Sequence, residues 1–234
     1  MYIVAHRGAS NDAPENTIPA FELAWQQGAD AIEGDFHLTA DGHIVCHHDP
    51  DIDSARSGKL VISDTKLEIL KQQRPDLPTL PKVLGSIPVG KRLFLEVKCG
   101  AEIIPRLLSD IYESGLEADQ ISVISFSQSV IQSLKTKAPQ YQAYWLVKRQ
   151  GLGLNAKPKL SEMLNAAGGL GADGISIKCN RYLTKDIAFG ITEAGMQFHT
   201  WTVDNVKLAR KLTSWGASSI TTNKPGLLVS MLDE

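Results

Sequence analysis

Short apolar runs rich in β-branched residues alternate with longer amphipathic stretches along the whole chain, and this alternation limits the fold more than any other feature. Alternating strands and helices favour a parallel sheet with helices outside it. Eight such units favour a closed (β/α)8 barrel over an open sheet. The predicted strands are 2–5, 31–38, 93–98, 121–125, 143–147, 174–177, 197–203 and 219–222, and 44–47 is expected to pair with the second of them.

One stretch, roughly residues 50–80, departs from this alternation. It is rich in Asp, Ser, Lys and Pro, and it is predicted to be a loop with a short helix near 64–72. It is therefore interpreted as a small insertion after the second strand. A length of 234 residues without low-complexity sequence predicts that residues 1–234 form a single barrel domain.

The composition limits the partners. A net charge of -2 with 21% charged residues provides no basic field for nucleic acid or an anionic membrane surface, so a small-molecule partner is expected. No apolar run approaches the ~20 residues of a membrane span.

The cysteines and the N-terminus bear on the cellular location. Cys46, Cys99 and Cys179 are far apart and form no C-x-x-C pair, and the N-terminus lacks the pattern of a signal peptide. Reduced thiols and a cytoplasmic location are therefore predicted.

Carboxylates gather at the predicted strand ends, where barrels of this type build their active sites. Glu33 and Asp35 are two residues apart on one strand and share a face, as do Glu96 and Lys98 on the next. Three carboxylates at one mouth would repel one another. Without a cation, their pKa values would shift and some of them would take up protons. Oxygen ligands favour a hard divalent ion, Mg²⁺ or Ca²⁺, over zinc.

Histidines and basic residues join these carboxylates. His6 and Arg7 end the first strand, and His48 closes the segment after the second. Histidines beside a hard metal suggest general acid–base catalysis, and Arg7 with Lys98 adds positive charge suited to a phosphate. The set predicts phosphodiester cleavage, in which one histidine activates the nucleophile and the other protonates the leaving alcohol.

Seven short motifs follow one another along the chain at spacings typical of one enzyme family. They are HRG (6–8), PENT (14–17), IEGD (32–35), HHDP (47–50), LEVK (95–98), WTVD (201–204) and TNKP (222–225). In this order they resemble the glycerophosphodiester phosphodiesterases, and the resemblance extends from residue 3 to about residue 228.

The resemblance implies a (β/α)8 barrel that hydrolyses glycerophosphodiesters to glycerol phosphate and an alcohol. It places metal ligands at Glu33, Asp35 and Glu96, an acid–base pair at His6 and His48, and phosphate contacts at Arg7 and Lys98. The nucleophile is either the glycerol 2-hydroxyl, through a cyclic phosphate, or water. The choice of alcohol and of Mg²⁺ or Ca²⁺ stays open.

Adjacent residues on an extended segment face opposite ways, so only one of His47 and His48 can point into the mouth. The resemblance selects His48, because Asp49 follows it as in the family motif. His37 and His43 are expected at the surface or in loops.

Four positions near the C-terminus have weaker assignments. Trp201 is predicted to form an apolar wall against the glycerol or alcohol part of the substrate, whereas His199 on the same strand face is given a structural role. Asp204 and Asn223 depart from the family pattern, which usually has Asn at the first position and often Asp at the second. Neither is an assigned ligand.

Three alternatives remain beside this function. A lysophospholipase D-like enzyme would act on a lipid phosphodiester and needs an apolar groove or loop at the mouth, which the mostly polar insertion does not favour. A non-catalytic sensor would bind a phosphodiester without consuming it. A metal hydrolase of the amidohydrolase type would use several histidines and a zinc-like ion, so the carboxylate set disfavours it.

Overall fold

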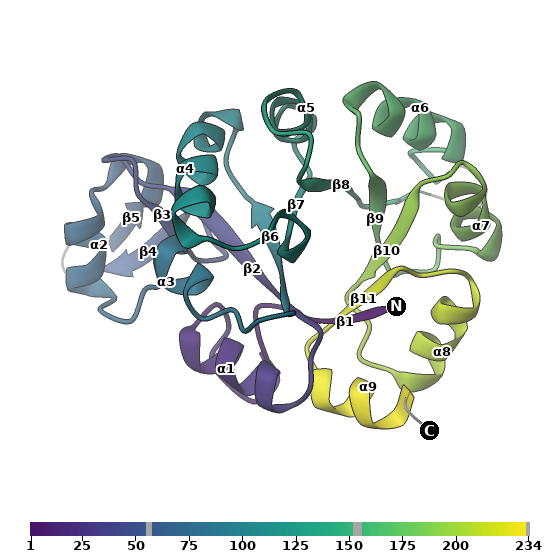
Figure 1. Cartoon of the computed structure of the whole chain (residues 1–234), viewed down its shortest axis with the longest axis horizontal. Coiled ribbons are helices and arrows are strands. Elements are labelled where there is room, and N and C mark those ends of the chain that lie inside the picture. Colours follow the sequence, from purple (N-terminus) through teal and green to yellow (C-terminus); the bar gives the residue numbers. More distant parts are fainter. Residues whose placement is uncertain (55–57, 152–155, 233–234) are drawn as a thin grey trace.

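Eight parallel strands close into a barrel that helices surround. The strands are β1 (Tyr2–Ala5), β2 (Ala31–Leu38), β6 (Arg92–Val97), β7 (Ile121–Ser125), β8 (Gln142–Val147), β9 (Gly174–Lys178), β10 (Gln197–Trp201) and β11 (Ser219–Thr222). In the computed structural model, which describes residues 1–54, 58–151 and 156–232, they lie at the centre with helices outside (Figure 1). Pairing runs from β1 through β11, β10, β9, β8, β7 and β6 to β2, and β1 also pairs with β2. The last pairing closes the sheet, so the predicted (β/α)8 barrel is confirmed.

The outer helices begin and end where local chemistry requires it. Thr17 caps α1 (Ile18–Gln26) by accepting a hydrogen bond from the backbone N–H of Ala20, and α4 (Ile104–Ser114) ends at Gly115 with φ of 70°. No helix in the described residues is long and apolar enough to cross a membrane. The other outer helices are α5 (Gln128–Lys137), α6 (Leu160–Leu170), α7 (Lys185–Glu193), α8 (Val206–Ser214) and α9 (Pro225–Leu232).

Side chains along each strand alternate between the barrel interior and the layer beneath the helices. In β6, Leu93 and Leu95 belong to the outer layer, whereas Phe94 packs inside the barrel with Val4. Glu96 lies two residues beyond Phe94, shares its inner face and therefore reaches the mouth at the C-terminal ends of the strands. The alternation that builds the core thus also directs polar side chains into the site.

The insertion between β2 and β6 has more structure than its sequence indicates. Besides β3 (Ile44–Cys46), which pairs antiparallel with β2, it contains a hairpin of β4 (Asp51–Ser54) and β5 (Gly58–Val61). The expected short helix is α2 (Leu67–Gln73), and α3 (Leu80–Leu84) follows. These elements pack at the edge of the barrel (Figure 1). The prediction of an irregular loop is wrong because a separate small core forms there, from Val45, Ile52, Ile62, Leu70 and Leu77.

Candidate active site

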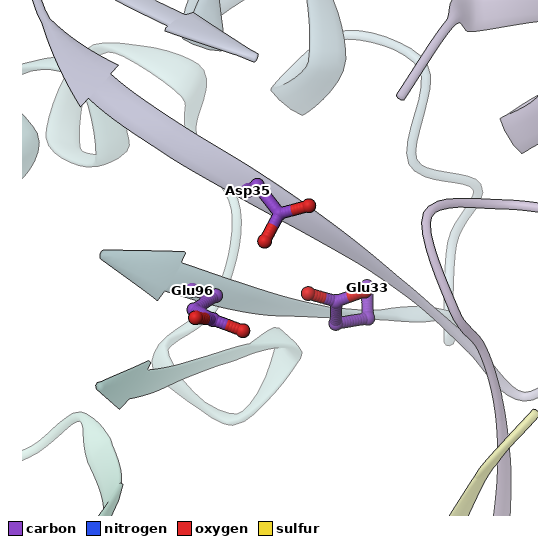
Figure 2. Close-up of side chains that lie close together, drawn as sticks. All are labelled: Glu33, Asp35 and Glu96. Atoms are coloured by element: carbon purple, nitrogen blue, oxygen red, sulfur yellow. The ribbon is translucent and has the colours of Figure 1, made fainter. Parts of the chain in front are cut away.

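Three carboxylates from two neighbouring strands meet at the mouth of the barrel. Asp35 of β2 lies opposite Glu96 of β6 in the strand register, and Glu33 shares the face of Asp35. Figure 2 shows the three side chains directed toward one common space. One oxygen from each lies within 4.8 Å of the others, and Glu33 and Asp35 are only 2% and 1% exposed. The structure therefore brings together the three acids predicted as metal ligands.

The electrostatics of this cluster are unfavourable for three bare charges. Burial, together with the nearby carboxylates of Asp35 and Glu96, raises the pKa of Glu33 well above its ordinary value. Burial and the charge of Asp35 likewise raise the pKa of Glu96. Arg7 contacts Asp35 through Nε at 3.0 Å, and Lys98 Nζ lies 3.3 Å from Asp35 and 3.0 Å from Glu96. Two bases therefore face the three acids of the cluster, and Arg7 is also shared with Glu15, so the acids outnumber the bases.

The donor set fits a hard divalent cation. The ligand atoms are all carboxylate oxygens, which Mg²⁺ and Ca²⁺ prefer. Glu33 Oε1 is buried and has no hydrogen-bond partner among the residues that the structure describes, and a buried unpaired oxygen is costly unless something binds it. The surplus negative charge adds to this fit. These residues could hold the ion together, with Lys98 and Arg7 at the edge of the cluster.

Arg7 is held in place by its backbone as well as its side chain. Its N–H donates to Glu33 Oε2 at 2.9 Å, and its guanidinium pairs with Glu15 at 2.9 Å as well as with Asp35. Its φ of 56° is left-handed, a conformation that costs energy in a non-glycine residue. Gly8 follows with φ of 82°, and a Cβ there would lie 2.6 Å from the backbone of Ala20. The strand end is therefore bent sharply toward the carboxylates.

Asn16, which lies within the PENT motif, is a site residue that was not among the predicted ones. Its Nδ2 donates to Asp35 Oδ2 at 2.8 Å, and its Oδ1 accepts from the backbone N–H of Asp35 at 3.1 Å. It is buried, with φ of 56°, a conformation that asparagine tolerates better than most residues. No sequence pattern indicated this role, because it depends on contacts between a loop and a distant strand.

His6 lies at the other side of the mouth, with its Nδ1 2.7 Å from Asn223 Oδ1. Burial lowers the pKa of His6, although the hydrogen bond with Asn223 opposes that shift. Asn223 in turn donates from Nδ2 to Asp204 Oδ2 at 2.7 Å. The two positions that depart from the family pattern are thus joined to each other and to His6.

His48, and not His47, lines the same cavity. Its side chain is 37% exposed, and Nδ1 lies 2.8 Å from Asp49 Oδ1. His47 instead contacts the carbonyl of Asp51 and the guanidinium of Arg74, on the side of the insertion.

The surface placement expected for His37 is wrong. It is 7% exposed, because it lies on β2 beneath the insertion. Its Nε2 is 3.3 Å from the carbonyl oxygen of His48, so it supports the segment that carries His48. Since His37 follows Asp35 by two residues on one strand, their shared face was a signal for this position.

The cavity at the mouth has a volume of about 140 Å³ and two chemical halves. Trp201 forms part of its apolar half. Phe126 was not among the predicted site residues, and it packs edge-on against Trp201 at 5.7 Å between ring centroids. His199 lies in the barrel interior against Tyr144, in agreement with its predicted structural role. By the polar half we mean the polar lining residues, His6, Arg7, Glu33, His48, Glu96, Lys98, Ser176 and Thr221, and by the apolar half Phe94, Ile124, Phe126, Leu146 and Trp201.

The fold and the site define the class of protein: a (β/α)8-barrel enzyme whose acidic, basic and histidine side chains converge at the C-terminal ends of the strands. Comparison with known protein families then identifies the family within this class. The model of the glycerophosphoryl diester phosphodiesterase family matches residues 6–227, and the chain belongs to this family. The predicted family and enzyme class, hydrolysis of glycerophosphodiesters, are thereby confirmed.

Individual relatives agree over their full lengths. The chain is 31% identical to YhdW of Bacillus subtilis, provisionally named a glycerophosphodiester phosphodiesterase, over 98% of this chain and 97% of that protein. It is 29% identical, with the same coverage, to the glycerophosphodiester phosphodiesterase of Caldanaerobacter subterraneus. The structure of an Oleispira antarctica phosphodiesterase in complex with the product sn-glycerol-3-phosphate superimposes with a TM-score of 0.85 at 26% identity, over 100% of this chain and 97% of that one.

Proposed function

We propose that this enzyme cleaves small glycerophosphodiesters into glycerol 3-phosphate and an alcohol, with a divalent cation held by Glu33, Asp35 and Glu96. The observation that carries the proposal is the convergence of these carboxylates with two histidines on one cavity. The product bound to the Oleispira antarctica phosphodiesterase supports the same chemistry. A bound cation would stabilise the negative charge that develops on the phosphoryl oxygens.

The residues of the chain supply the remaining steps. Arg7 and Lys98, both at the cavity and both fixed by carboxylates, orient the phosphate oxygens. One histidine takes the proton of the attacking hydroxyl as its oxygen bonds to phosphorus. The bond from phosphorus to the alcohol oxygen breaks, and the other histidine protonates that oxygen. The attacking hydroxyl is water or the glycerol 2-hydroxyl. In the second case a cyclic phosphate forms first, and water then opens it to glycerol 3-phosphate. An analogue without the 2-hydroxyl distinguishes the two.

We infer the roles of the two histidines from their surroundings. The Nδ1 of His6 faces a neutral amide oxygen and its pKa is lowered mainly by burial, which suits a base. The Nδ1 of His48 faces the carboxylate of Asp49, a partner for the imidazolium of an acid. A p-nitrophenyl leaving group needs no proton. His48→Ala should therefore lose less activity on a p-nitrophenyl phosphodiester than on glycerophosphocholine, whereas His6→Ala should lose activity on both.

The direct test of metal dependence is release of glycerol 3-phosphate from glycerophosphocholine, with and without EDTA, followed by re-addition of Mg²⁺ or Ca²⁺. Activity that disappears with EDTA and returns with one ion supports the proposal and identifies a usable metal. Glu33→Ala, Asp35→Ala and Glu96→Ala should each abolish turnover, whereas Glu193→Ala, an exposed acid at the end of α7, should not. Full turnover of the three site variants without metal would contradict the carboxylate site.

A lipid phosphodiester is the second candidate substrate. Phe126 is 46% exposed beside the apolar half of the cavity, where an acyl chain could leave the site. The charged and histidine side chains in the same lining favour a small polar substrate instead. Turnover of glycerophosphocholine compared with lysophosphatidylcholine, at matched concentrations below micelle formation, decides between them.

Two broader predictions belong to this proposal. We place the reaction in the cytoplasm, which the free thiols of Cys46, Cys99 and Cys179 support. We also propose that residues 1–234 act as one domain, because the described strands and helices all belong to the barrel or to its insertion.

A further inference from the structure

Asn223 joins His6 to a carboxylate that does not itself touch the histidine. Asp204 receives three hydrogen bonds, from Thr222 Oγ1 at 2.9 Å, from the backbone N–H of Asn223 at 2.7 Å and from Asn223 Nδ2 at 2.7 Å. A carboxylate that faces three donors accepts all three bonds. The amide nitrogen of Asn223 must therefore point at Asp204, and its oxygen must point the other way.

This orientation fixes the protonation of His6. Asn223 Oδ1 is only an acceptor, so the His6 Nδ1 that lies 2.7 Å from it must carry a proton. Ser10 Oγ donates to the same oxygen at 3.1 Å, which agrees with the orientation that Asp204 sets. In a neutral His6 the lone pair is then on Nε2, the nitrogen that remains for a ligand in the cavity that His6 lines.

We propose that Asn223 and Asp204 are positioning residues, which hold His6 in the Nδ1–H tautomer with its Nε2 ready to accept the proton of the attacking hydroxyl. The inference rests on the proposed function, because it presumes that His6 is the base. Asp204 acts through Asn223: without its carboxylate the amide could rotate and offer Nδ2 to His6, which would favour the wrong tautomer. Loss of the correct tautomer leaves the fold intact and removes the base.

The pair can be tested by exchanging its two side chains. Asn223→Asp alone places two carboxylates in contact where Nδ2 and Oδ2 are 2.7 Å apart. Adding Asp204→Asn restores a donor opposite the new acid. The exchanged variant, Asn223→Asp with Asp204→Asn, keeps the net charge and the chain of hydrogen bonds, but it moves the negative charge next to His6.

A carboxylate beside His6 should raise the pKa of the histidine, by about one unit or more for a charge in direct contact. The other charged groups that act on His6 are Arg7, which lowers its pKa, and Asp35 and Glu15, which raise it, and the exchange leaves all three in place. The acidic limb of the pH profile of kcat should therefore move to higher pH in the exchanged variant. A purely structural role for the pair predicts no such shift.

Turnover of glycerophosphocholine with added metal is the measurement, with thermal unfolding as the check on folding. Asn223→Ala should lower kcat by about 10- to 100-fold, the usual effect of removing a partner that orients a histidine, with little change in KM. Asn223→Asp should also be impaired, and the exchanged variant should recover most of kcat with its acidic limb shifted upward. The matched control is Asn165→Asp with Asp186→Asn, the same change at exposed positions of α6 and α7.

Each result separates this inference from the proposed function. Wild-type kcat in Asn223→Ala, together with an inactive His6→Ala, overturns the positioning role and leaves the base in place. An exchanged variant that is no better than Asn223→Asp, or that recovers without any shift of the acidic limb, also overturns it. Full activity of His6→Ala would instead refute the assignment of the base itself.

Discussion

The side chain of Asn16 bonds to the buried Asp35 twice, once at its carboxylate and once at its backbone N–H. Nδ2 donates to Asp35 Oδ2, and Oδ1 accepts from the Asp35 N–H. Asp35 also faces the two basic side chains of the mouth, Arg7 and Lys98. Asn16 therefore fixes the central member of the proposed metal cluster without contributing a charge.

We expect Asn16→Gly to weaken metal binding by about 10- to 100-fold, the cost typical of losing a partner that orients a metal ligand. Glycine accepts the φ of 56°, so the free energy of unfolding should fall less than in Asn16→Ala, which adds strain of about 1 kcal/mol or more. Calorimetric titration with Mg²⁺ or Ca²⁺ and urea unfolding measure the two effects. Unchanged affinity in Asn16→Gly would show that Asp35 needs no such support.

Gly8→Ala should destabilise the protein by on the order of 2 kcal/mol or more and reduce activity, because its Cβ would lie 2.6 Å from the backbone of Ala20 in addition to the cost of a φ of 82°. Gly42→Ala is the matched control: its φ is 79°, but no atom of the described residues lies within 4 Å of the added Cβ. Urea unfolding of both variants separates crowding from backbone strain. Equal losses in the two would mean that the contact with Ala20 costs nothing.

The barrel could be predicted from the sequence because each strand carries its own signal. The apolar runs are short and β-branched, and the amphipathic helices lie between them. The acids could be placed for the same reason: Glu33 and Asp35 are two residues apart, so a single strand sets their common face, and the barrel brings Glu96 beside them. Predictions of this kind need only local periodicity and one closed sheet.

What could not be predicted depends on contacts between distant loops. Asn16 acts through a left-handed backbone and a hydrogen bond to another element, and neither has a periodic pattern. The hairpin of the insertion is held by single apolar residues, such as Ile52 and Leu70, that are spread over several segments. Asn223 and Asp204 could be named as departures from the family pattern, but only the structure shows that they bond to each other.

Phe126→Ala should raise KM for glycerophosphocholine by about 3- to 10-fold and leave kcat within about twofold, because an aromatic contact of this kind contributes about 0.5–1.5 kcal/mol. Phe126 packs against Trp201 at the apolar half of the cavity, and its ring carries no group that could transfer a proton or hold a cation. Tyr112→Ala, at an exposed position of α4, is the control for loss of an aromatic ring. A fall in kcat at constant KM would place Phe126 in the chemistry instead of in substrate binding.

His199 should make folding stability depend on pH. It is buried among Phe94 and Tyr144, its Nε2 has no partner in the described part of the chain, and burial lowers its pKa to about 3. The unfolded chain, with a histidine pKa of about 6.5, then binds more protons than the folded one, so stability falls as the pH drops below about 6.5 and continues to fall down to about 3. From this residue alone we expect a loss of about 2 kcal/mol between pH 7 and pH 5.

The measurement is urea unfolding of the wild type and of His199→Asn at both pH values, with His43→Asn as the matched control. Asparagine can still bond to Ser219, which His199 contacts through Nδ1 at 2.7 Å, but it does not titrate. The loss on acidification should therefore be about 2 kcal/mol smaller in His199→Asn, even if that variant is less stable at pH 7. The same loss in all three proteins would mean that His199 is not the neutral, buried histidine whose protonation opposes folding.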